Sequence, residues 1–342
     1  MRNLMNHFLY KSIFWYINFI SLPILCIAPQ NPYNYDESYY NIAKKLGSSD
    51  GILVIAYNRP RFFAEAVNAL SKTPEADYLP FIFVLDGGKK STQKENIKII
   101  NNARIRNKFI IARDTNYGCG RSIIDARRFM FEWCNFNRII IFEDDLVVSP
   151  EYITLTFNVH KWAKIHYPNI GVVSCFYRCY LDSYTKRIKL ESVQETTDCF
   201  WGYCLDKTVY NTIKDILNEY ENTFLTTSQG SNTPDIACWM EQILYTAENA
   251  IIRNYLPCSI ISYKKEFEEY ITRLKTLPRL RNEQDRQFRL ALYKKGYVKI
   301  STCVNRAKYI GSRSNRDNGI NLDRFPSDMV RKNFKIECIS MA

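Results

Sequence analysis

Four short apolar runs without polar interruption occur in the first half of the chain, at residues 52–56, 81–85, 109–112 and 139–142. Runs of this length are typical of strands that are buried on both faces of a parallel sheet. Apolar residues recur at helical spacing after the first and third runs, which predicts helices there. Strands alternating with helices predict an α/β fold with a mostly parallel central sheet flanked by helices.

Polar residues follow the predicted strands at the end where each run stops. They are Asn58 and Arg59, Asp86 with Gly87 and Gly88, Asp114, and the triplet Glu143, Asp144 and Asp145. Ligands of open α/β sheets bind beyond the carboxyl ends of the strands, so we expect the functional site there.

The acidic triplet at residues 143–145 directly follows a predicted buried strand. Three carboxylates in that position are costly unless a cation meets them. A divalent metal that also binds phosphate oxygens is one such partner. The alternative is a cluster that caps a helix beginning near Pro150. The chain has no GxGxxG segment after the first strand and no P-loop, but the turn at residues 118–120 could help to hold an anion at a helix start.

An uncharged apolar stretch occupies residues 12–28, after Arg2 and Lys11. It is at the short end of the roughly 17–25 residues that span a bilayer. A membrane signal-anchor, a cleaved signal peptide and a buried or interfacial helix are all open readings. For the anchor, the basic start predicts a cytoplasmic N-terminus and the bulk of the chain in the secretory lumen or outside the cytoplasm, with association at the cytoplasmic face as an alternative.

The expected organisation of the whole chain follows from this leader. Residues 1–30 form the signal-anchor or signal peptide and residues 31–47 a polar stem. Residues 48–335 form the main folded domain, with a first half up to residue 150 and a second half after it.

Composition narrows the chemistry. The chain has only three histidines, so proton transfer and metal binding are expected to depend on carboxylates. The eleven cysteines contain no CxxC pair, which makes a zinc ribbon improbable and leaves disulfides and buried thiols both open. The net charge of +12 raises the question of nucleic acid as a partner, but the basic residues are scattered and no nucleic-acid-binding signature is present, so no such partner is expected.

Five segments together resemble one enzyme family. They are FEDDLVVSPEYITL (142–155), GILVIAYNRP (51–60), FVLDGG (83–88), TDCFWGYCL (197–205) and EQDRQFRLALYKKGYVKISTCVNRAKYIG (283–311).

The first segment resembles the DXD segment of GT-A glycosyltransferases, the nucleotide-diphospho-sugar transferase fold. It is especially similar to the EDDLxVxPDF segment of the β-1,2-N-acetylglucosaminyltransferase I family. The other segments keep that family's order, and the resemblance spans about residues 50–320. It implies that residues 48–335 are a catalytic domain, with a nucleotide-sugar-binding half at 48–150 and an acceptor-binding half at 151–335. Family-2 glycosyltransferases share most of these motifs and remain an alternative.

The resemblance implies that Asp145 binds a metal, Mn²⁺ or Mg²⁺, which bridges the donor diphosphate. Glu143 and Asp144 would face the ribose or the sugar. A histidine that GT-A enzymes often place near the C-terminus as a metal ligand is absent, so Arg313 or Arg316 would contact phosphate instead.

The same resemblance places the nucleotide. Asn58 and Arg59 would line its pocket, and Asp86 would contact the base. Arg121 could neutralise phosphate, and a surface salt bridge is the alternative for this side chain.

Inverting sugar transfer requires a carboxylate that takes the proton of the acceptor hydroxyl. Asp285 is the first candidate, in the first turn of a predicted helix that ends at Gly296, where the helix dipole favours the ionised form. The alternative is that Asp285 only caps the helix. Glu283 and Asp235 are further candidates.

Aromatic residues around Gly202 are expected to shape the sugar site. Rings such as Phe200, Trp201 and Tyr203 stack on the apolar faces of sugars, and Gly202 allows close approach of the backbone. Ordinary core packing is the alternative for these rings.

The expected activity is a metal-dependent inverting transfer of a sugar from a UDP-sugar to a hydroxyl of a glycan, glycoprotein or glycolipid. The resemblance indicates GlcNAc as the donor sugar. The alternatives are a family-2-type enzyme of surface polysaccharide synthesis with another donor sugar, and a non-catalytic basic binding protein.

Overall fold

The computed structural model describes residues 46, 49–176, 193–195, 200–225, 236, 239–240, 268–269, 271–272, 284–302 and 305–311. The apolar stretch at residues 12–28, the expected stem, and the candidate residues Glu283, Asp235, Arg313 and Arg316 lie outside this set. Among the residues described, no helix combines the length and the apolar character needed to cross a membrane.

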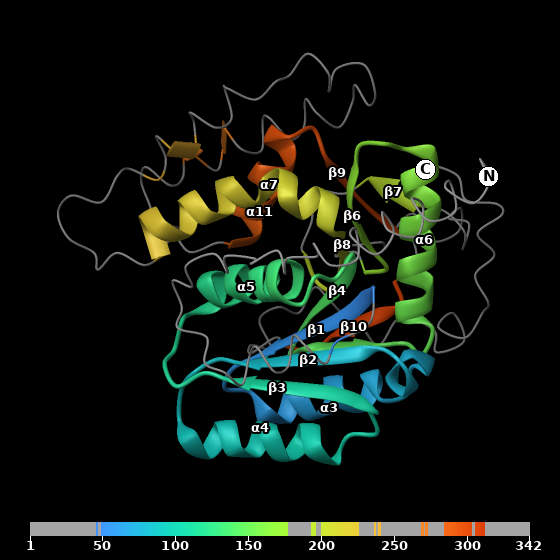
Figure 1. The fold of residues 1–342 in the computed structure, drawn as a ribbon, viewed down its shortest axis with the longest axis vertical. Coiled ribbons are helices and arrows are strands. Elements are labelled where there is room, and N and C mark those ends of the chain that lie inside the picture. Colours follow the sequence, from blue (N-terminus) through green and yellow to red (C-terminus); the bar gives the residue numbers. More distant parts are fainter. Residues whose placement is uncertain are drawn as a thin grey trace, which may run out of the picture. The chain divides into compact units, whose positions relative to one another are not determined.

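The described strands of the central sheet are arranged in the order β3-β2-β1-β4-β8-β6-β9-β7 (Figure 1). All of them except β7 and β8 run in the same direction, which confirms the mostly parallel sheet. The strands are β1 (Asp50–Ala56), β2 (Pro80–Leu85), β3 (Asn107–Ala112), β4 (Arg138–Glu143), β6 (Ile170–Ser174), β7 (Val193–Glu195), β8 (Tyr203–Asp206) and β9 (Val298–Thr302). The four predicted apolar runs are β1 to β4.

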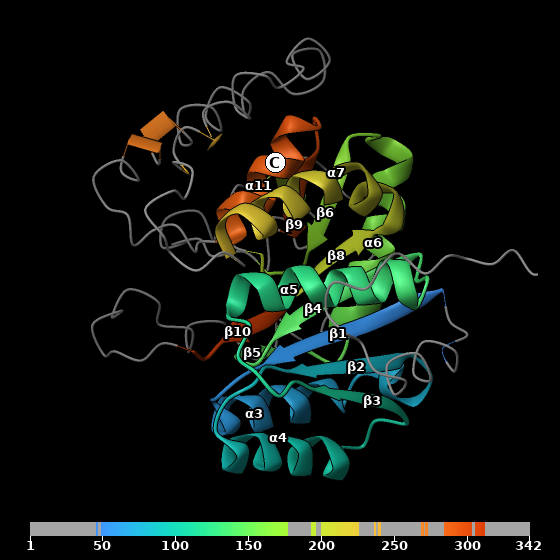
Figure 2. The same ribbon diagram turned by 60° about the vertical axis from the view of Figure 1, so that its left-hand side comes forward.

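Helices cover both faces of this sheet (Figures 1 and 2). Alternate residues of the strands, such as Ile52 and Val54 of β1, belong to a buried apolar cluster with one set of helices. That set is α3 (Pro60–Leu70), α4 (Lys90–Asn102) and α6 (Tyr152–His166). The other face is covered by α5 (Cys119–Arg128), α7 (Lys207–Tyr220) and α11 (Gln284–Lys294). The predicted helices correspond to α3, α5 and α11.

The strand order reverses between β1 and β4, and this reversal positions the site. β1 is paired with β2 on one side and with β4 on the other, and Ile55 lies opposite Glu143. The residues that follow these two strands therefore emerge side by side. A crevice at such a reversal is where open α/β sheets bind ligands.

A second, two-stranded sheet crosses this edge. β5 (Leu146–Val148) directly follows the acidic triplet and pairs antiparallel with β10 (Ala307–Tyr309). The backbone N–H of Ile310 donates to the carbonyl of Asp145 at 2.9 Å. The end of the described chain is thereby fixed beside the acidic triplet.

Asp206, the last residue of β8, contacts both α7 and α6. Its carboxylate caps α7 by accepting from the Val209 N–H at 2.8 Å, and it lies 3.1 Å from the Lys164 ammonium and 3.2 Å from His160 Nε2. Burial alone would raise the pKa of Asp206, but these partners outweigh burial and lower the pKa to about 2. The ionised carboxylate therefore stabilises the folded chain.

Replacing Asp206 by Asn is expected to reduce the free energy of unfolding by about 1–2 kcal/mol at pH 7, because a charged cap and an ion pair are lost. A lowered pKa contributes stability above the unfolded value near 4, and that contribution disappears as pH falls toward 2. Urea unfolding measures the free energy of unfolding of the wild-type chain and of Asp206→Asn. The difference between the two values should be constant from pH 7 to 5 and should shrink below pH 4. The exposed Asp215 on the same helix is the matched control, and Asp215→Asn should change stability by less than about 0.5 kcal/mol. Equal effects of the two substitutions would contradict the assignment.

Candidate active site

A cavity of about 590 Å³ lies at the carboxyl ends of β1, β2 and β4. It is polar on the side of the strand ends and is open to the first residues of α5. Its lining consists of Ile55, Ala56, Tyr57, Asn58, Arg59, Asp86, Asn116, Gly118, Cys119, Ser122, Ile123, Glu143, Asp144, Tyr309 and Gly311. The expectation of a site at these strand ends is met by this cavity.

Arg59 bridges two carboxylates of the acidic triplet. Its Nη2 donates to Asp144 Oδ1, and its Nη1 lies 2.7 Å from Asp145 Oδ2. Burial disfavours the charge of Arg59, but the two carboxylates more than compensate and raise its pKa. The chain itself thus supplies part of the positive charge that the buried triplet requires. This charge belongs to Arg59, the third residue after the neighbouring strand β1.

The carboxyl groups of the triplet remain short of positive charge. Burial raises the pKa of Asp144 and Asp145 although Arg59 opposes the shift. Burial, Asp285 and the two neighbouring acids raise the pKa of Glu143. One arginine therefore does not balance these acids.

Asp145 carries the feature that suits a divalent cation. Its Oδ1 is buried and, in the described part of the chain, has no hydrogen-bond partner. Gly311 lies against the same side chain, and a Cβ at this glycine would collide with Asp145 Oδ2. Among the residues described, no group of three His, Cys, Asp or Glu side chains is arranged to hold a metal.

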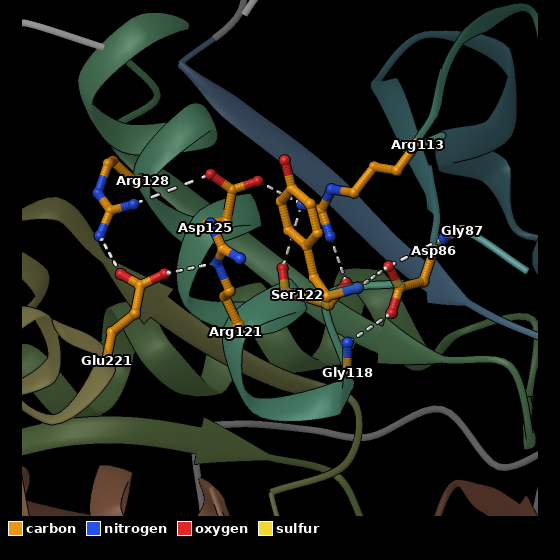
Figure 3. A network of polar contacts seen from close by, with 10 residues as sticks. Asp86, Gly87, Arg113, Gly118, Arg121, Ser122, Asp125, Arg128 and Glu221 are labelled. Atoms are coloured by element: carbon orange, nitrogen blue, oxygen red, sulfur yellow. Dashed lines mark hydrogen bonds and ion pairs between the residues drawn. The ribbon is translucent and has the colours of Figure 1, made fainter. Parts of the chain in front are cut away.

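Asp86 organises a loop at the cavity (Figure 3). Its Oδ1 accepts from the N–H groups of Gly87 at 3.0 Å and Tyr117 at 2.9 Å, and its Oδ2 accepts from the Gly118 N–H at 3.0 Å. Gly118, with φ of 75°, occupies a backbone conformation that favours glycine just before α5 begins. Asp86 therefore holds the loop that leads into α5. The sequence-based expectation for Asp86 was a contact with the base of the nucleotide and did not include this role.

Arginine pairs hold α5 in place on the sheet (Figure 3). Arg113, at the end of β3, donates to Ser122 Oγ at 2.5 Å and pairs with Asp125. Arg128 pairs with Glu221 at 2.7 Å on the side of α7. These contacts are buried, and removing one partner would leave an uncompensated charge, so α5 is rigidly placed.

Arg121 points away from the cavity toward this framework. Its guanidinium lies 4.3 Å from the centre of the Tyr117 ring, and its Nε lies 3.7 Å from Glu221 Oε1. Of the two alternatives for Arg121, the contacts in this structure favour the ion pair.

Asp285 lies in the first turn of α11, as expected, near the end of β4. The backbone N–H of Phe200 donates to its carboxylate, and Asp285 is close enough to raise the pKa of Glu143. Burial raises the pKa of Asp285 itself. Burial therefore acts on Asp285 in the direction opposite to the one expected from the helix dipole.

The start of α11 lies close to the start of α5 at Gly120. A Cβ at Gly120 would lie 3.5 Å from the Cβ of Gln284, the residue before Asp285, which is an ordinary van der Waals separation.

Trp201 and Gly202 shape the other side of the acidic triplet. The Trp201 ring is stacked on Tyr309, with ring centres 4.2 Å apart and planes 5° apart. Gly202 has φ of 58°, and a Cβ there would meet Tyr152 Oη at 2.5 Å and Leu146. The aromatic segment is therefore packed tightly against β5, the strand that follows Asp145.

The predicted residues fall into two groups. Asn58, Arg59, Asp86, Glu143 and Asp144 line the cavity. The remaining five lie around it and are not part of its lining: Arg121, Asp145, Trp201, Gly202 and Asp285.

Sequence reasoning did not single out Tyr57, Asn116 and Ser122 as lining residues. The position of Tyr57 directly after the first apolar run was an available signal. The cavity wall also includes Cys119, from the turn at residues 118–120, and Tyr309 and Gly311, from the matched segment 283–311. The approach of Tyr309 and Gly311 to the acidic triplet depends on the pairing of β10 with β5 and could not be predicted. Cys119 is one of the four free thiols in the described residues, with Cys134, Cys175 and Cys204.

Comparison with known proteins adds similarity but no family assignment. No protein-family model matches the sequence, and no curated protein matches it. Among solved structures, the mannosyltransferase PcManGT from Pyrobaculum calidifontis, in complex with GDP-Man and Mn²⁺, is 13% identical over 75% of this chain and 93% of its own, with a TM-score of 0.37.

Two further solved structures are similar at the same level. TarS 1–349 from S. aureus is 13% identical over 68% of this chain and 73% of its own, with a TM-score of 0.37. Glucosyl-3-phosphoglycerate synthase from Mycobacterium tuberculosis, in complex with Mn²⁺ and UDP, is 13% identical over 58% of this chain and 73% of its own, with a TM-score of 0.32. Similarity this low does not assign an activity, which has to be inferred from the residues of the chain.

Replacing Asp86 by Asn is expected to destabilise the fold by about 1–3 kcal/mol, because an amide NH₂ would face a backbone N–H that now has an acceptor. Urea unfolding at pH 7 measures this loss. Asp114→Asn is the matched control at the end of the next strand, where the carboxylate is 93% exposed in a surface pair with Lys90. Its effect should be below about 0.5 kcal/mol. A stable Asp86→Asn protein would show that the carboxylate does not hold the loop.

Proposed function

We propose that this chain is a metal-dependent inverting glycosyltransferase of the GT-A type that uses a UDP-sugar. The observation that carries the proposal is the arrangement at the ends of β1 and β4. A cavity there is lined by Glu143, Asp144 and Arg59, and Asp145 and Asp285 lie around it. Burial raises the pKa of these four carboxyl groups, and Asp145 Oδ1 has no hydrogen-bond partner among the described residues. Such a site is suited to a cation together with an anionic ligand.

Asp145 is the residue proposed to hold the cation, Mn²⁺ or Mg²⁺, through Oδ1. A bound divalent cation would supply positive charge to the diphosphate of the leaving group. Arg59 adds a fixed guanidinium beside it, and the N-terminus of α5, which begins at Cys119, lies at the cavity. These groups of the chain would orient the donor and stabilise its phosphates.

Asp285 is the proposed base. The hydroxyl oxygen of the acceptor forms a bond to the anomeric carbon while the bond from that carbon to the diphosphate oxygen breaks, which inverts the configuration. The hydroxyl proton passes to the Asp285 carboxylate. A buried carboxylate of raised pKa is a stronger base than an exposed one and is well matched to this task.

The finer assignments rest on sequence motifs. The order of the matched segments supports kinship with the β-1,2-N-acetylglucosaminyltransferase I family, with GlcNAc as the donor sugar and a glycan, glycoprotein or glycolipid as acceptor. A family-2-type enzyme with another donor sugar is the alternative. The apolar stretch at residues 12–28 supports membrane attachment, with the catalytic domain outside the cytoplasm.

The test is a screen of UDP- and GDP-sugars for nucleotide release by the full chain, with Mn²⁺ or Mg²⁺ and after their removal by chelation. We expect release from a UDP-sugar that requires the metal. Asp145→Asn should reduce it about 100-fold or more, since a metal contributes several kcal/mol to the transition state. Asp114→Asn, an exposed acid at another strand end, should retain wild-type release.

Two results would defeat the proposal. One is the absence of release from every nucleotide sugar by folded protein with metal present. The other is an equal rate for Asp145→Asn and the wild-type chain, which would leave a non-catalytic binding protein as the better account.

A further inference from the structure

Arg127 is a buried cation that the proposed chemistry has not used. Its side chain on α5 is 1% exposed and is among the largest fully buried side chains. Its Nε donates to the hydroxyl of Tyr203 at 3.0 Å, and its Nη2 donates to the same oxygen. Its guanidinium carbon lies 4.0 Å from the centre of the Phe288 ring. The guanidinium is therefore held in one orientation.

The neighbouring arginines of this region differ from Arg127 in their partners. Arg113 pairs with Asp125, and Arg128 pairs with Glu221. Within the described residues, Arg127 makes no such direct ion pair. A charge buried in this way is costly unless negative charge lies nearby. A purely structural role would be met as well by an apolar side chain of similar volume.

Asp285 provides that nearby negative charge. Burial disfavours its ionisation, and among the charges that oppose this effect Arg127 comes first, ahead of Lys299 and Arg289. Among the described residues no direct ion pair joins Arg127 to Asp285, and the geometry links them through Phe288. The ring of Phe288, which the guanidinium faces, lies one helical turn after Asp285 on α11, so Phe288 and Asp285 project from the same face of that helix.

Charged and titratable groups face Asp285 from every element around it. They are Glu143 of β4, Arg127 and Cys119 of α5, Tyr203 of β8, Lys299 of β9, and Arg289 of α11 itself. Cys119 and Tyr203 are neutral near pH 7, because burial raises the pKa of each to about 12. Glu143 opposes a second negative charge, and the three cations favour it.

We propose that Arg127 is a positioning residue, which keeps the Asp285 carboxylate anionic and correctly placed to accept a proton. The proposal rests on the proposed glycosyl transfer for its catalytic part. Arg127 does not touch the substrate and acts through Asp285. Tyr203 anchors the guanidinium, so the charge stays near the carboxylate.

The test compares Arg127→Gln, Arg127→Lys and Tyr203→Phe in the full chain. Arg128→Gln is the matched control, since Arg128 is the adjacent buried arginine of the same helix and pairs with Glu221 and Asn218 instead. Arg127→Gln removes the charge, Arg127→Lys keeps it, and Tyr203→Phe keeps the arginine but removes its anchor. Thermal unfolding of each variant establishes that it is folded at the assay temperature.

The first readout does not need activity. Carbon NMR of protein labelled at the Asp carboxyl carbon, with Asp285→Asn to assign the signal, follows the titration of Asp285. Loss of an opposite charge at close range moves a carboxyl pKa by about 1–3 units. Arg127→Gln should raise the titration midpoint of Asp285 by at least about one pH unit, while Arg127→Lys and Arg128→Gln should leave it within about half a unit.

The second readout is the pH dependence of kcat for nucleotide release. A raised pKa leaves less of the base ionised, so the acidic limb of the profile for Arg127→Gln should move to higher pH by the same amount. The kcat of this variant at pH 7 should fall about 10-fold or more, with the donor KM within about twofold. Arg127→Lys should restore the pH midpoint, and Tyr203→Phe should lower kcat with a smaller shift.

The outcomes distinguish a failure of the proposed glycosyl transfer from a failure of the positioning role of Arg127. If the wild-type chain releases no nucleotide, the proposed function fails, and the NMR titration still decides whether Arg127 controls Asp285. If Arg127→Gln leaves the titration unchanged, or Arg128→Gln shifts it equally, the positioning role is overturned. Should Arg127→Gln fail to fold, a wild-type midpoint together with a wild-type kcat in Tyr203→Phe would overturn it as well.

Discussion

The contact of Arg59 with Asp144 and Asp145 is the interaction on which the site depends. The carboxylates come from the end of β4 and the guanidinium from the residues after β1, and the parallel pairing of these strands brings them together. Without the arginine, two adjacent buried acids would be left without an opposite charge, which is strongly unfavourable. With it, the acids are held in place while still short of positive charge, a state in which a further cation is favoured.

The surrounding framework keeps this arrangement rigid. Asp86 fixes the entry to α5, and the pairs of Arg113 and Arg128 hold the helix between the sheet and α7 (Figure 3). On the opposite side, β10 pairs with β5, and Tyr309 stacks on Trp201. A cavity whose walls are fixed in this way can bind a charged ligand with little reorganisation, which is the main requirement of electrostatic catalysis.

Local signals were sufficient to predict β1 to β4 and the helices α3, α5 and α11. The apolar runs are uninterrupted and bounded by polar turns, so each strand can be recognised from its own residues without knowledge of distant contacts. The insertion of the antiparallel β8 between β4 and β6 could not be predicted, because it is decided by pairing between strands that are far apart in the chain. For the same reason the approach of Gly311 to Asp145 was missed.

The candidate site, too, could be predicted only in part. Its location at the strand ends could be predicted, since parallel strands share that edge. The partners of its side chains could not. Asp86 accepts three backbone hydrogen bonds that no spacing indicates, and burial raises the pKa of Asp285. Charge balance within a buried cluster depends on every neighbour, and one sequence does not list the neighbours.

The central claim is that a divalent cation and a nucleoside diphosphate share the site beside Asp145. Calorimetric titration of the full chain with UDP, in the presence of Mn²⁺ and in its absence, tests it most directly. The account predicts binding that depends on the metal in the wild-type chain and is lost in Asp145→Asn. UDP binding of equal strength with and without the metal, or in the wild-type chain and the variant alike, would contradict it.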